Sequence, residues 1–204
     1  MKIFVFGAGG HAAVVLDLCE TLGVGVAGIY DDISSSLTNF PQYPFLGRIC
    51  DLSPEFSGPS IIAIGNNRVR HKISKQFPFC EWVSLVHPSA QIGSGVKIGR
   101  GAVIFAGSVV QARAKVGDHV IVNTSATVDH DCIIEDFAHI APGCNLSGNV
   151  RIGEGSLMGV GSCSVPDMEI GEWSIVGAGG VVVSNIPAGA TAVGVPAKVV
   201  KRVF

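Results

Sequence analysis

Aliphatic side chains recur at every sixth position over almost half of the chain, from Val86 to Val182. Sixteen of these seventeen positions hold Val, Ile, Leu or Met, with Ser164 as the exception, and no insertion shifts the register. The residue four places after each of them is small at all but Met168 and Ile186. A period of six fits neither an α-helix, whose period is 3.6, nor a flat strand, whose period is 2.

This rhythm predicts a β-helix of hexapeptide repeats. Each hexad forms a short strand and a corner, three hexads close a triangular coil, and the aliphatic residue fills the interior. The seventeen hexads make between five and six coils. We expect the N-terminal region and the stretch from about Ile186 to cover the two ends, where strand edges are otherwise unpaired.

Gly, Asn or Asp often stands directly after the aliphatic position. We interpret these residues as the ones that take a left-handed backbone conformation at the corners. They are Gly93, Gly99, Gly117, Asn123, Asp129, Gly153, Gly159, Gly171 and Gly177.

The first 84 residues alternate between strand and helix patterns instead. Buried strands are predicted over 2–6, 25–30 and 60–65, and helices over 12–23 and 66–77. This alternation indicates βαβ connections and a parallel sheet. We therefore predict an α/β, Rossmann-like domain over 1–84 and an all-β domain with a C-terminal tail over 85–204.

A glycine-rich loop, Gly7-Ala-Gly-Gly-His11, joins the first strand to the first helix. Such a loop lets backbone N–H groups approach a phosphate at a helix N-terminus. Asp31 and Asp32 follow the second strand and suit a ribose or a base. An NAD-dependent dehydrogenase is one alternative, but 84 residues supply half of a dinucleotide fold and no hydride-transfer domain follows. His11 either caps the helix or meets the ligand.

The composition of the chain limits the classes of partner and the cellular compartment to be expected. Charged residues make up 15% of the chain and the net charge is −2, which argues against a nucleic-acid or membrane-surface footprint. The six cysteines lack metal-ligand spacing and fit buried thiols in a reducing compartment. No charged residue occurs from Trp173 to Ala197, but five glycines and two prolines interrupt that stretch. We expect a soluble, cytoplasmic protein.

Five motifs together resemble one family. They are GAGGHA (7–12), IAIGNNRVR (62–70), NTSATVDHDC (123–132), IEDFAHIAPGCNLSGNV (134–150) and VGVPAK (193–198). In this order they resemble the bacterial sugar acetyltransferases of the left-handed β-helix (hexapeptide repeat) superfamily, over essentially the whole chain. The most similar subgroup holds acetyl-CoA-dependent N-acetyltransferases acting on nucleotide-linked amino sugars, with sialic acid O-acetyltransferases as relatives.

The resemblance implies a left-handed parallel β-helix after the α/β domain, and an acyltransferase of polysaccharide or glycan biosynthesis. It implies acetyl-CoA as co-substrate, no permanently bound cofactor, and a homotrimer with active sites between subunits. His130 matches the general base, and Asp131 matches an acidic neighbour that is often Glu. The implied substrate-binding residues are Gly9, Gly10, His11, Asp31, Asp32, Gly65 and Asn66, and those implied for acetyl-CoA are His139, Gly148, Val160 and Ala178.

The hexad register places His130 at a corner, because it is the third residue of the hexad that begins at Val128. A corner side chain points away from the interior, so His130 is either solvated or faces a neighbouring subunit. His139 and His119 fall at a different corner, so one site that uses His130 and His139 spans two chains. We interpret His119 and His87 as structural. Spacings of 11 and 9 residues do not cluster three histidines, so we expect no metal.

The chemistry expected is direct attack of a sugar amino group on the thioester. An imidazole accepts a proton near neutral pH, a carboxylate orients it, and backbone N–H groups near Gly148 stabilise the oxyanion. The alternatives are an O-acetyltransferase acting on a sialic acid or related sugar hydroxyl, and a non-catalytic trimer that binds nucleotide. The nucleotide, the sugar carbon and the acyl chain stay open.

Overall fold

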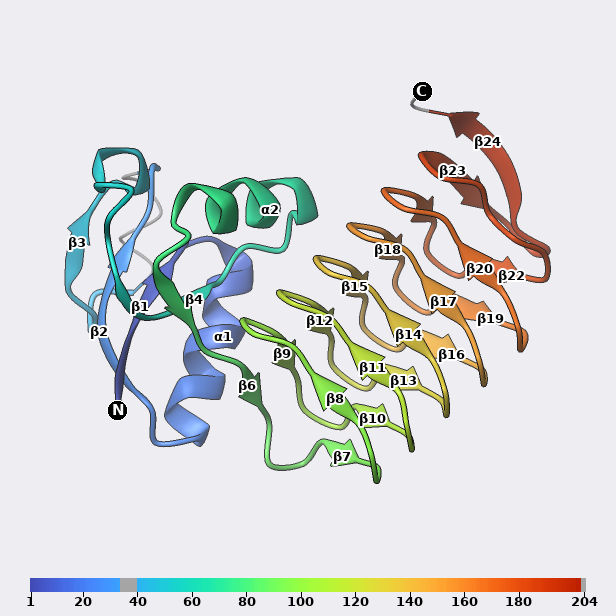
Figure 1. Ribbon diagram of the computed structural model, residues 1–204, viewed down its shortest axis with the longest axis horizontal. Helices are drawn as coiled ribbons and strands as arrows, with labels where there is room; N and C mark the ends of the chain where they lie inside the picture. The colour runs from blue at the N-terminus through green and yellow to red at the C-terminus, as the bar shows by residue number, and fades with distance from the viewer. Residues whose placement is uncertain (34–39, 203–204) are drawn as a thin grey trace.

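The computed structural model describes residues 1–33 and 40–202. An α/β part lies beside the first coils of a long parallel β-helix (Figure 1). Both architectures were predicted from the sequence, and both are confirmed.

The α/β part is built on a five-stranded parallel sheet in the order β3-β2-β1-β4-β5. Its elements are β1 (Lys2–Phe6), α1 (Gly10–Thr21), β2 (Gly25–Tyr30), β3 (Phe45–Gly47), the 3-10 helix η2 (Ile49–Asp51), β4 (Gly58–Ile62), α2 (Asn67–Gln76) and β5 (Cys80–Trp82). The first two predicted strands are confirmed, whereas the third begins and ends earlier than expected. The short strands β3 and β5 carry too little pattern to be seen in the sequence.

The β-helix contains seventeen strands of two residues each. They are β6 (Leu85–Val86), β7 (Gln91–Ile92), β8 (Lys97–Ile98), β9 (Val103–Ile104), β10 (Val109–Val110), β11 (Lys115–Val116), β12 (Ile121–Val122), β13 (Thr127–Val128), β14 (Ile133–Ile134), β15 (His139–Ile140), β16 (Asn145–Leu146), β17 (Arg151–Ile152), β18 (Leu157–Met158), β19 (Cys163–Ser164), β20 (Glu169–Ile170), β21 (Ile175–Val176) and β22 (Val181–Val182). From β6 to β19, each strand pairs with the strand three further along, eighteen residues on, as Val110 does with Val128.

Three flat faces result from this pairing. We call the sheet that starts with β6 and includes β9, β12 and β15 the first face, the sheet from β7 to β22 the second face, and the sheet from β8 to β20 the third face. The second residue of the strands points inward, and these side chains form one continuous core that leaves out Ile92 and the polar Ser164. The aliphatic rhythm therefore predicted the interior correctly.

The glycines that follow the aliphatic positions have a different role from the one expected. Positive φ angles occur three residues after the aliphatic position, for example at Gly95, Arg113 and Asp131, and not one residue after it. A Cβ on Gly93 would instead lie 2.6 Å from the backbone nitrogen of Ala112. These glycines are needed because neighbouring coils approach closely there, so the interpretation as left-handed corner residues was wrong.

The two ends of the β-helix are finished differently. At the C-terminal end β23 (Ala190–Val193) adds to β21, and β24 (Lys198–Arg202) pairs antiparallel with β23, as expected for a cover. The uncharged stretch from Trp173 to Ala197 thus forms strands, and no helix in the described part of the chain is long and apolar enough to cross a membrane. At the other end Ile92 remains 40% exposed.

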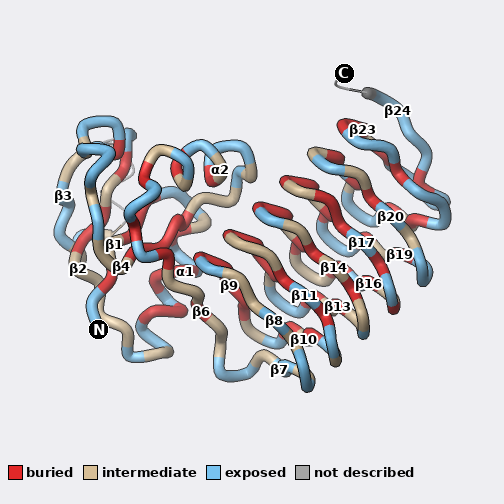
Figure 2. Tube along the Cα trace, in the orientation of Figure 1, coloured by how far each residue is buried: buried red, intermediate tan, exposed pale blue. Residues whose placement is uncertain are grey.

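The α/β part covers the side of the β-helix and not its end, contrary to expectation. Helix α1 packs on the outer surface of the first face, where Leu85, Val103 and Ile121 join the core beneath it. Figure 2 shows buried segments where the two parts meet. Apolar side chains that protrude from the first face decide this arrangement, since each contributes about 1.5–3 kcal/mol when buried.

Candidate active site

The α/β part contains a cavity of about 500 Å³. The glycine loop, the end of β2, the loop after β4 and one side of α2 form its walls. Six of the seven residues predicted to bind substrate line it, namely Gly9, Gly10, His11, Asp31, Asp32 and Gly65. The seventh, Asn66, caps α2 instead, because its Oδ1 accepts a hydrogen bond from the Val69 N–H at 3.1 Å.

The two aspartates after β2 differ in their hydrogen bonds. Asp31 is buried, and its oxygens accept the N–H groups of Ala8 (2.5 Å) and Ile33 (2.6 Å). Asp32 is exposed, and its Oδ1 accepts the Cys50 N–H at 2.8 Å. Asp31 therefore braces the glycine loop against β2. Asp32 lines the cavity at the end of β2.

His11 lies in the first turn of α1 and faces His139 of β15, with 6.3 Å between the ring centroids. The imidazole Nε2 of His139 is 3.0 Å from the side-chain nitrogen of Asn123. Burial, aided by the nearby Arg70 charge, lowers the pKa of His11 to about 4 and that of His139 to about 3. Both imidazoles are therefore neutral near pH 7. The structure places His139 beside the cavity, on the first face.

His130 stands at the corner between β13 and β14, where the second and third faces meet. Its Nδ1 lies 2.8 Å from Oδ2 of Asp131. Arg113, one coil earlier, donates to both oxygens of Asp131, at 2.6 and 2.7 Å. Hydrogen bonds from Arg113 and then His130 hold the pKa of Asp131 well below its usual range. A carboxylate only accepts, so Nδ1 carries the hydrogen and Nε2 is free to act as a base.

Gly148 occupies the same corner one coil further along. A Cβ at this position would lie 2.6 Å from Cε1 and 2.7 Å from Nε2 of His130, so the imidazole rests on the bare backbone. The His130 side chain remains 56% exposed and points outward, as the hexad register predicted. The structure therefore brings His130, Asp131 and Gly148 together.

The other residues predicted to bind acetyl-CoA lie elsewhere on this chain. Val160 and Ala178 are exposed at the corner between the first and second faces, on successive coils. His139 lies on the first face. Within one chain, the four predicted residues thus occupy three separate places.

Comparison with known proteins identifies the family of this chain. The family described as the PglD N-terminal domain matches residues 2–77. GDP-perosamine N-acetyltransferase from Escherichia coli O157:H7 is 32% identical over 211 residues, covering 97% of this chain and 96% of that protein. The chain belongs to the hexapeptide-repeat sugar acetyltransferases.

Solved structures agree with this membership. A histidine-to-asparagine variant of perosamine N-acetyltransferase from Caulobacter crescentus, in complex with CoA and GDP-perosamine, is 35% identical with a TM-score of 0.91, covering 98% of this chain and 97% of that one. The acetyltransferase domain of PglB from Neisseria gonorrhoeae FA1090, in complex with acetyl coenzyme A, is 40% identical with a TM-score of 0.86, covering 98% of each chain.

Other relatives match in part only. The chain spans 25% of the uncharacterized protein L142 of Acanthamoeba polyphaga mimivirus and 40% of a serine acetyltransferase from Buchnera aphidicola. Membership of the sugar acetyltransferase family confirms the predicted enzyme class, an acyltransferase with acetyl-CoA as co-substrate.

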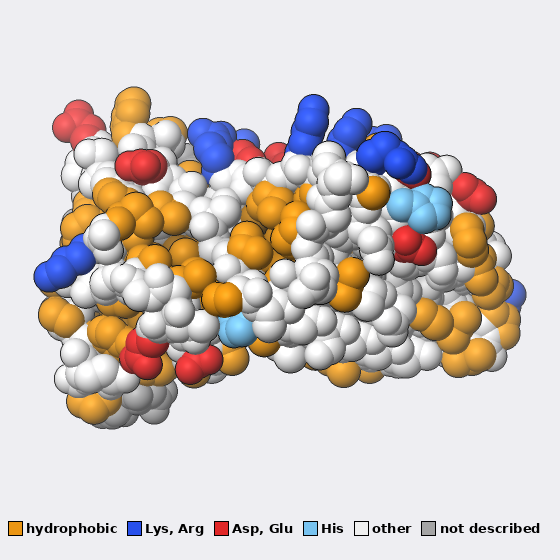
Figure 3. Space-filling model, turned by 90° about the horizontal axis from the view of Figure 1, so that it is seen from below, with side chains coloured by type: hydrophobic (Ala, Val, Ile, Leu, Met, Phe, Trp, Pro, Cys, Tyr) orange, Lys and Arg blue, Asp and Glu red, His pale blue; other side chains and the backbone are white. Residues whose placement is uncertain are grey.

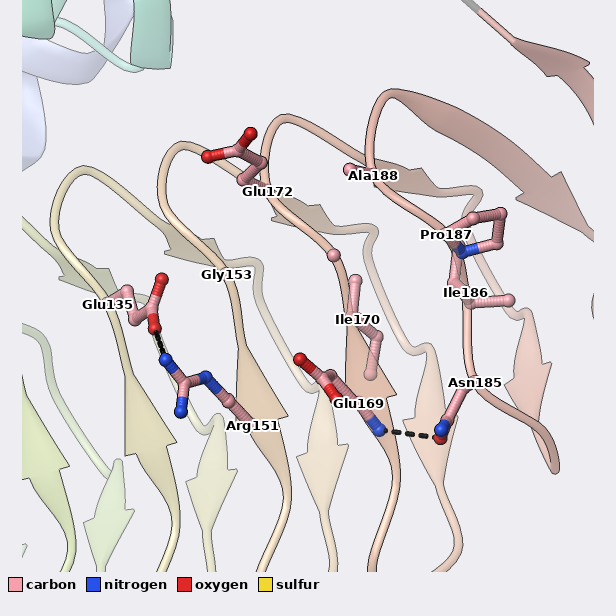
Figure 4. Close-up of a pocket in the computed structure, with 11 residues that line it drawn as sticks. Glu135, Arg151, Gly153, Glu169, Ile170, Glu172, Asn185, Ile186, Pro187 and Ala188 are labelled. Carbon is pink, nitrogen blue, oxygen red and sulfur yellow. Dashed lines mark hydrogen bonds and ion pairs between the residues drawn. The ribbon is translucent and has the colours of Figure 1, made fainter.

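This acetyltransferase has a second hollow, of about 530 Å³, on the outer surface of the third face (Figure 4). The side chains of Glu135 and Arg151 point toward each other there and form an ion pair. The N–H of Glu169 donates to Oδ1 of Asn185 at 2.9 Å. None of the predicted catalytic, substrate-binding or acetyl-CoA-binding residues lines this hollow.

Sequence reasoning missed three residues whose side chains contact the predicted site residues, namely Arg70, Arg113 and Asn123. Arg113 lies eighteen residues before Asp131, one full coil, and the hexad register would have revealed that pairing. Asn123 lies two residues after Ile121, which is the strand partner of His139 one coil on, so the register also brings Asn123 close to His139. Arg70 shares the buried side of α2 with Ile73. Residues three apart share a face of a helix, so the position of Arg70 relative to Ile73 indicated a buried side chain. Arginine usually stays exposed, and this hid the signal.

Proposed function

We propose that this enzyme transfers an acetyl group from acetyl-CoA to the amino group of a nucleotide-linked amino (deoxy)sugar. The observation that carries the proposal is the outward-facing His130 imidazole, held by Asp131 on one side and by the backbone of Gly148 on the other. A GDP-linked amino sugar bound to a relative with a TM-score of 0.91 supports the acceptor class. We assign nucleotide-sugar binding to residues 1–84 and acetyl transfer to 85–204.

The proposed chemistry follows from the free Nε2 of His130. The amine nitrogen attacks the thioester carbonyl carbon, and its proton passes to Nε2. Asp131 stabilises the imidazolium that forms. Collapse of the tetrahedral intermediate breaks the carbon–sulfur bond, and the imidazolium returns the proton to the CoA thiolate. Atoms and charge balance without a covalent enzyme intermediate.

The oxyanion needs a donor near the same corner. The backbone N–H of Gly148 makes no hydrogen bond within the described residues. It lies beside His130 and is available for the oxygen of the tetrahedral intermediate.

Two subunits are needed to join the parts of the site. His130 stands where the second and third faces meet, whereas His139 lies on the first face and the cavity lies in the α/β part that packs against that face. A homotrimer in which the His130 corner of one chain meets the first face of the next would unite them.

The composition of the faces supports this arrangement. The outward residues of the second face carry no charge, and they are Gln91, Val109, Thr127, Asn145, Cys163 and Val181. Those of the third face include Lys97, Lys115, Arg151 and Glu169. Seen from below, the β-helix shows a broad area with few charges and a row of Lys and Arg side chains along one edge (Figure 3). We infer that the second face lies between copies.

Thiol release from acetyl-CoA in the presence of GDP-, UDP- and dTDP-linked amino sugars tests the proposal. We expect release with at least one of them, and about a hundredfold slower turnover for His130→Ala. His87→Ala serves as the control, because His87 contacts Ser89 on the first coil, away from the site. Release only when a sialic acid is the acceptor would favour the O-acetyltransferase alternative. No thiol release with any of the acceptors would favour the non-catalytic trimer.

A further inference from the structure

Arg70 is among the most buried side chains in the molecule, with 1% of its surface exposed. It lies on α2, which forms one wall of the nucleotide cavity. The described residues supply no carboxylate within ion-pair distance of its guanidinium group. Burial lowers the pKa of Arg70 to about 9, so the side chain is charged near pH 7.

The guanidinium group is satisfied entirely by backbone carbonyls from two parts of the fold. On the cavity side it donates to Ile64 O at 3.2 Å and Gly65 O at 2.9 Å. On the β-helix side it donates to His119 O at 3.1 Å and Phe137 O at 2.7 Å, which belong to successive coils. A fifth contact reaches Ala138 O at 3.5 Å.

A buried charge is a costly way to fill space. Apolar side chains of similar volume pack an interior at least as favourably. The planar guanidinium, with five donors in a fixed fork, is suited to holding several acceptors at set distances, which neither Met nor Lys reproduces. The hydrogen bonds of Arg70 therefore indicate a role in geometry beyond packing.

We propose that Arg70 is a positioning residue, which fixes the Gly65 wall of the nucleotide cavity relative to the coils of the β-helix. Gly65 lines the cavity beside His11, whose Cβ lies 3.8 Å from the position of an added Cβ on Gly65. Displacement of this wall would move the sugar end of a bound nucleotide away from the acetyl-transfer groups. The identity of that ligand rests on the proposed function.

The variants Arg70→Lys and Arg70→Met test the role, and Arg68→Met is the matched control. Arg68 is also on α2 and lies over the ring of Trp173 at 4.7 Å, so it contacts the same corner of the β-helix without lining the cavity. Arg70→Lys keeps the charge but cannot reach all the carbonyls.

Steady-state kinetics well below the unfolding temperature give the decisive result. We expect kcat/KM for the nucleotide sugar to fall about tenfold to a hundredfold in both Arg70 variants, with KM for acetyl-CoA within about twofold of the parent. Arg68→Met should retain parental constants. Unchanged kinetics with a lowered thermal midpoint would overturn the proposal and show a structural role only. Failure of both Arg70 variants to fold would overturn it in the same way.

A binding measurement separates this proposal from the proposed function. Calorimetric titration with GDP, UDP and dTDP needs no acetyl transfer. Weaker binding by the Arg70 variants than by Arg68→Met would support the positioning role even if the parent acetylates no amino sugar tested. Equal nucleotide affinity, together with unchanged kcat, would exclude it.

Discussion

The imidazole of His130 lies against the backbone of Gly148, where a Cβ would come within 2.6 Å of the ring. The two residues are eighteen positions apart and therefore share a corner on successive coils. Any side chain at position 148 must push the imidazole outward, away from the orientation that Asp131 sets. Because His130 is exposed, it is free to yield without disturbing the core.

Gly148→Ala should accordingly lower kcat by about tenfold to a hundredfold while leaving the thermal midpoint almost unchanged. The φ angle of Gly148 is not in the left-handed region, so alanine adds no backbone strain there. Initial-rate kinetics and a thermal melt measure the two effects. Parental kcat in this variant would show that the contact has no bearing on catalysis.

Asp131→Asn should reduce kcat by about tenfold to a hundredfold, because the amide holds the imidazole less well and does not stabilise its cation. Asn tolerates the positive φ of 60° at this position, so the corner is preserved. Asp118→Asn is the control, since Asp118 pairs with Arg100 eighteen residues away in the same manner. If both variants lose activity equally, the orienting role of Asp131 is wrong.

Mixed oligomers test whether the site spans two chains. Gly10→Phe should fill the nucleotide cavity, because a side chain at Gly10 meets nothing within 4 Å. When it is co-expressed with His130→Ala, about a quarter of the sites in a random trimer combine an intact cavity with an intact His130. Recovery of about that fraction of parental activity is expected. A mixture no more active than its separate components would place the whole site in one chain.

Substitutions of the two aspartates of the cavity should differ in their effect on the free energy of unfolding. Asp31→Asn places an amide where two backbone N–H groups are accepted, so we expect a lower free energy of unfolding, by about 1–3 kcal/mol, and weaker nucleotide binding. Asp32→Asn should weaken nucleotide binding alone. Urea unfolding and calorimetric titration measure both. Equal loss of stability in the two variants would contradict the assignment.

Acid should destabilise the fold through buried neutral histidines. Burial lowers the pKa of His119 to about 4, below its unfolded value of about 6.5. The neutral His119 imidazole therefore contributes fully to the free energy of unfolding above pH 6.5. This contribution is lost as the pH falls toward 4, and the loss between pH 7 and pH 5 is about 2 kcal/mol. His119→Phe should show a smaller loss between these pH values in urea unfolding at one protein concentration. Phe137 fills the equivalent corner one coil later, so the substitution fits.

Much of this site was predictable from local spacing. His130 falls outside the core and Asp131 beside it because the hexad register sets both directions. The roles of Gly93 and its equivalents were misread, because the contact that requires glycine is made with the next coil and does not show in the backbone angles of one hexad. The docking of α1 on Leu85, Val103 and Ile121 was missed for a similar reason, since outward residues of a repeat obey no period.

The sequence by itself determined the coil, the parallel sheet, the glycine loop and the family, because each of these depends on spacing within a short segment. Only the tertiary structure decided that His139 faces His11, that Arg70 joins Gly65 to Phe137, and that the α/β part with its cavity packs against the first face. Those relationships depend on which surfaces meet. The protruding apolar side chains of the first face select α1 as a neighbour, and no pattern within a segment encodes that choice.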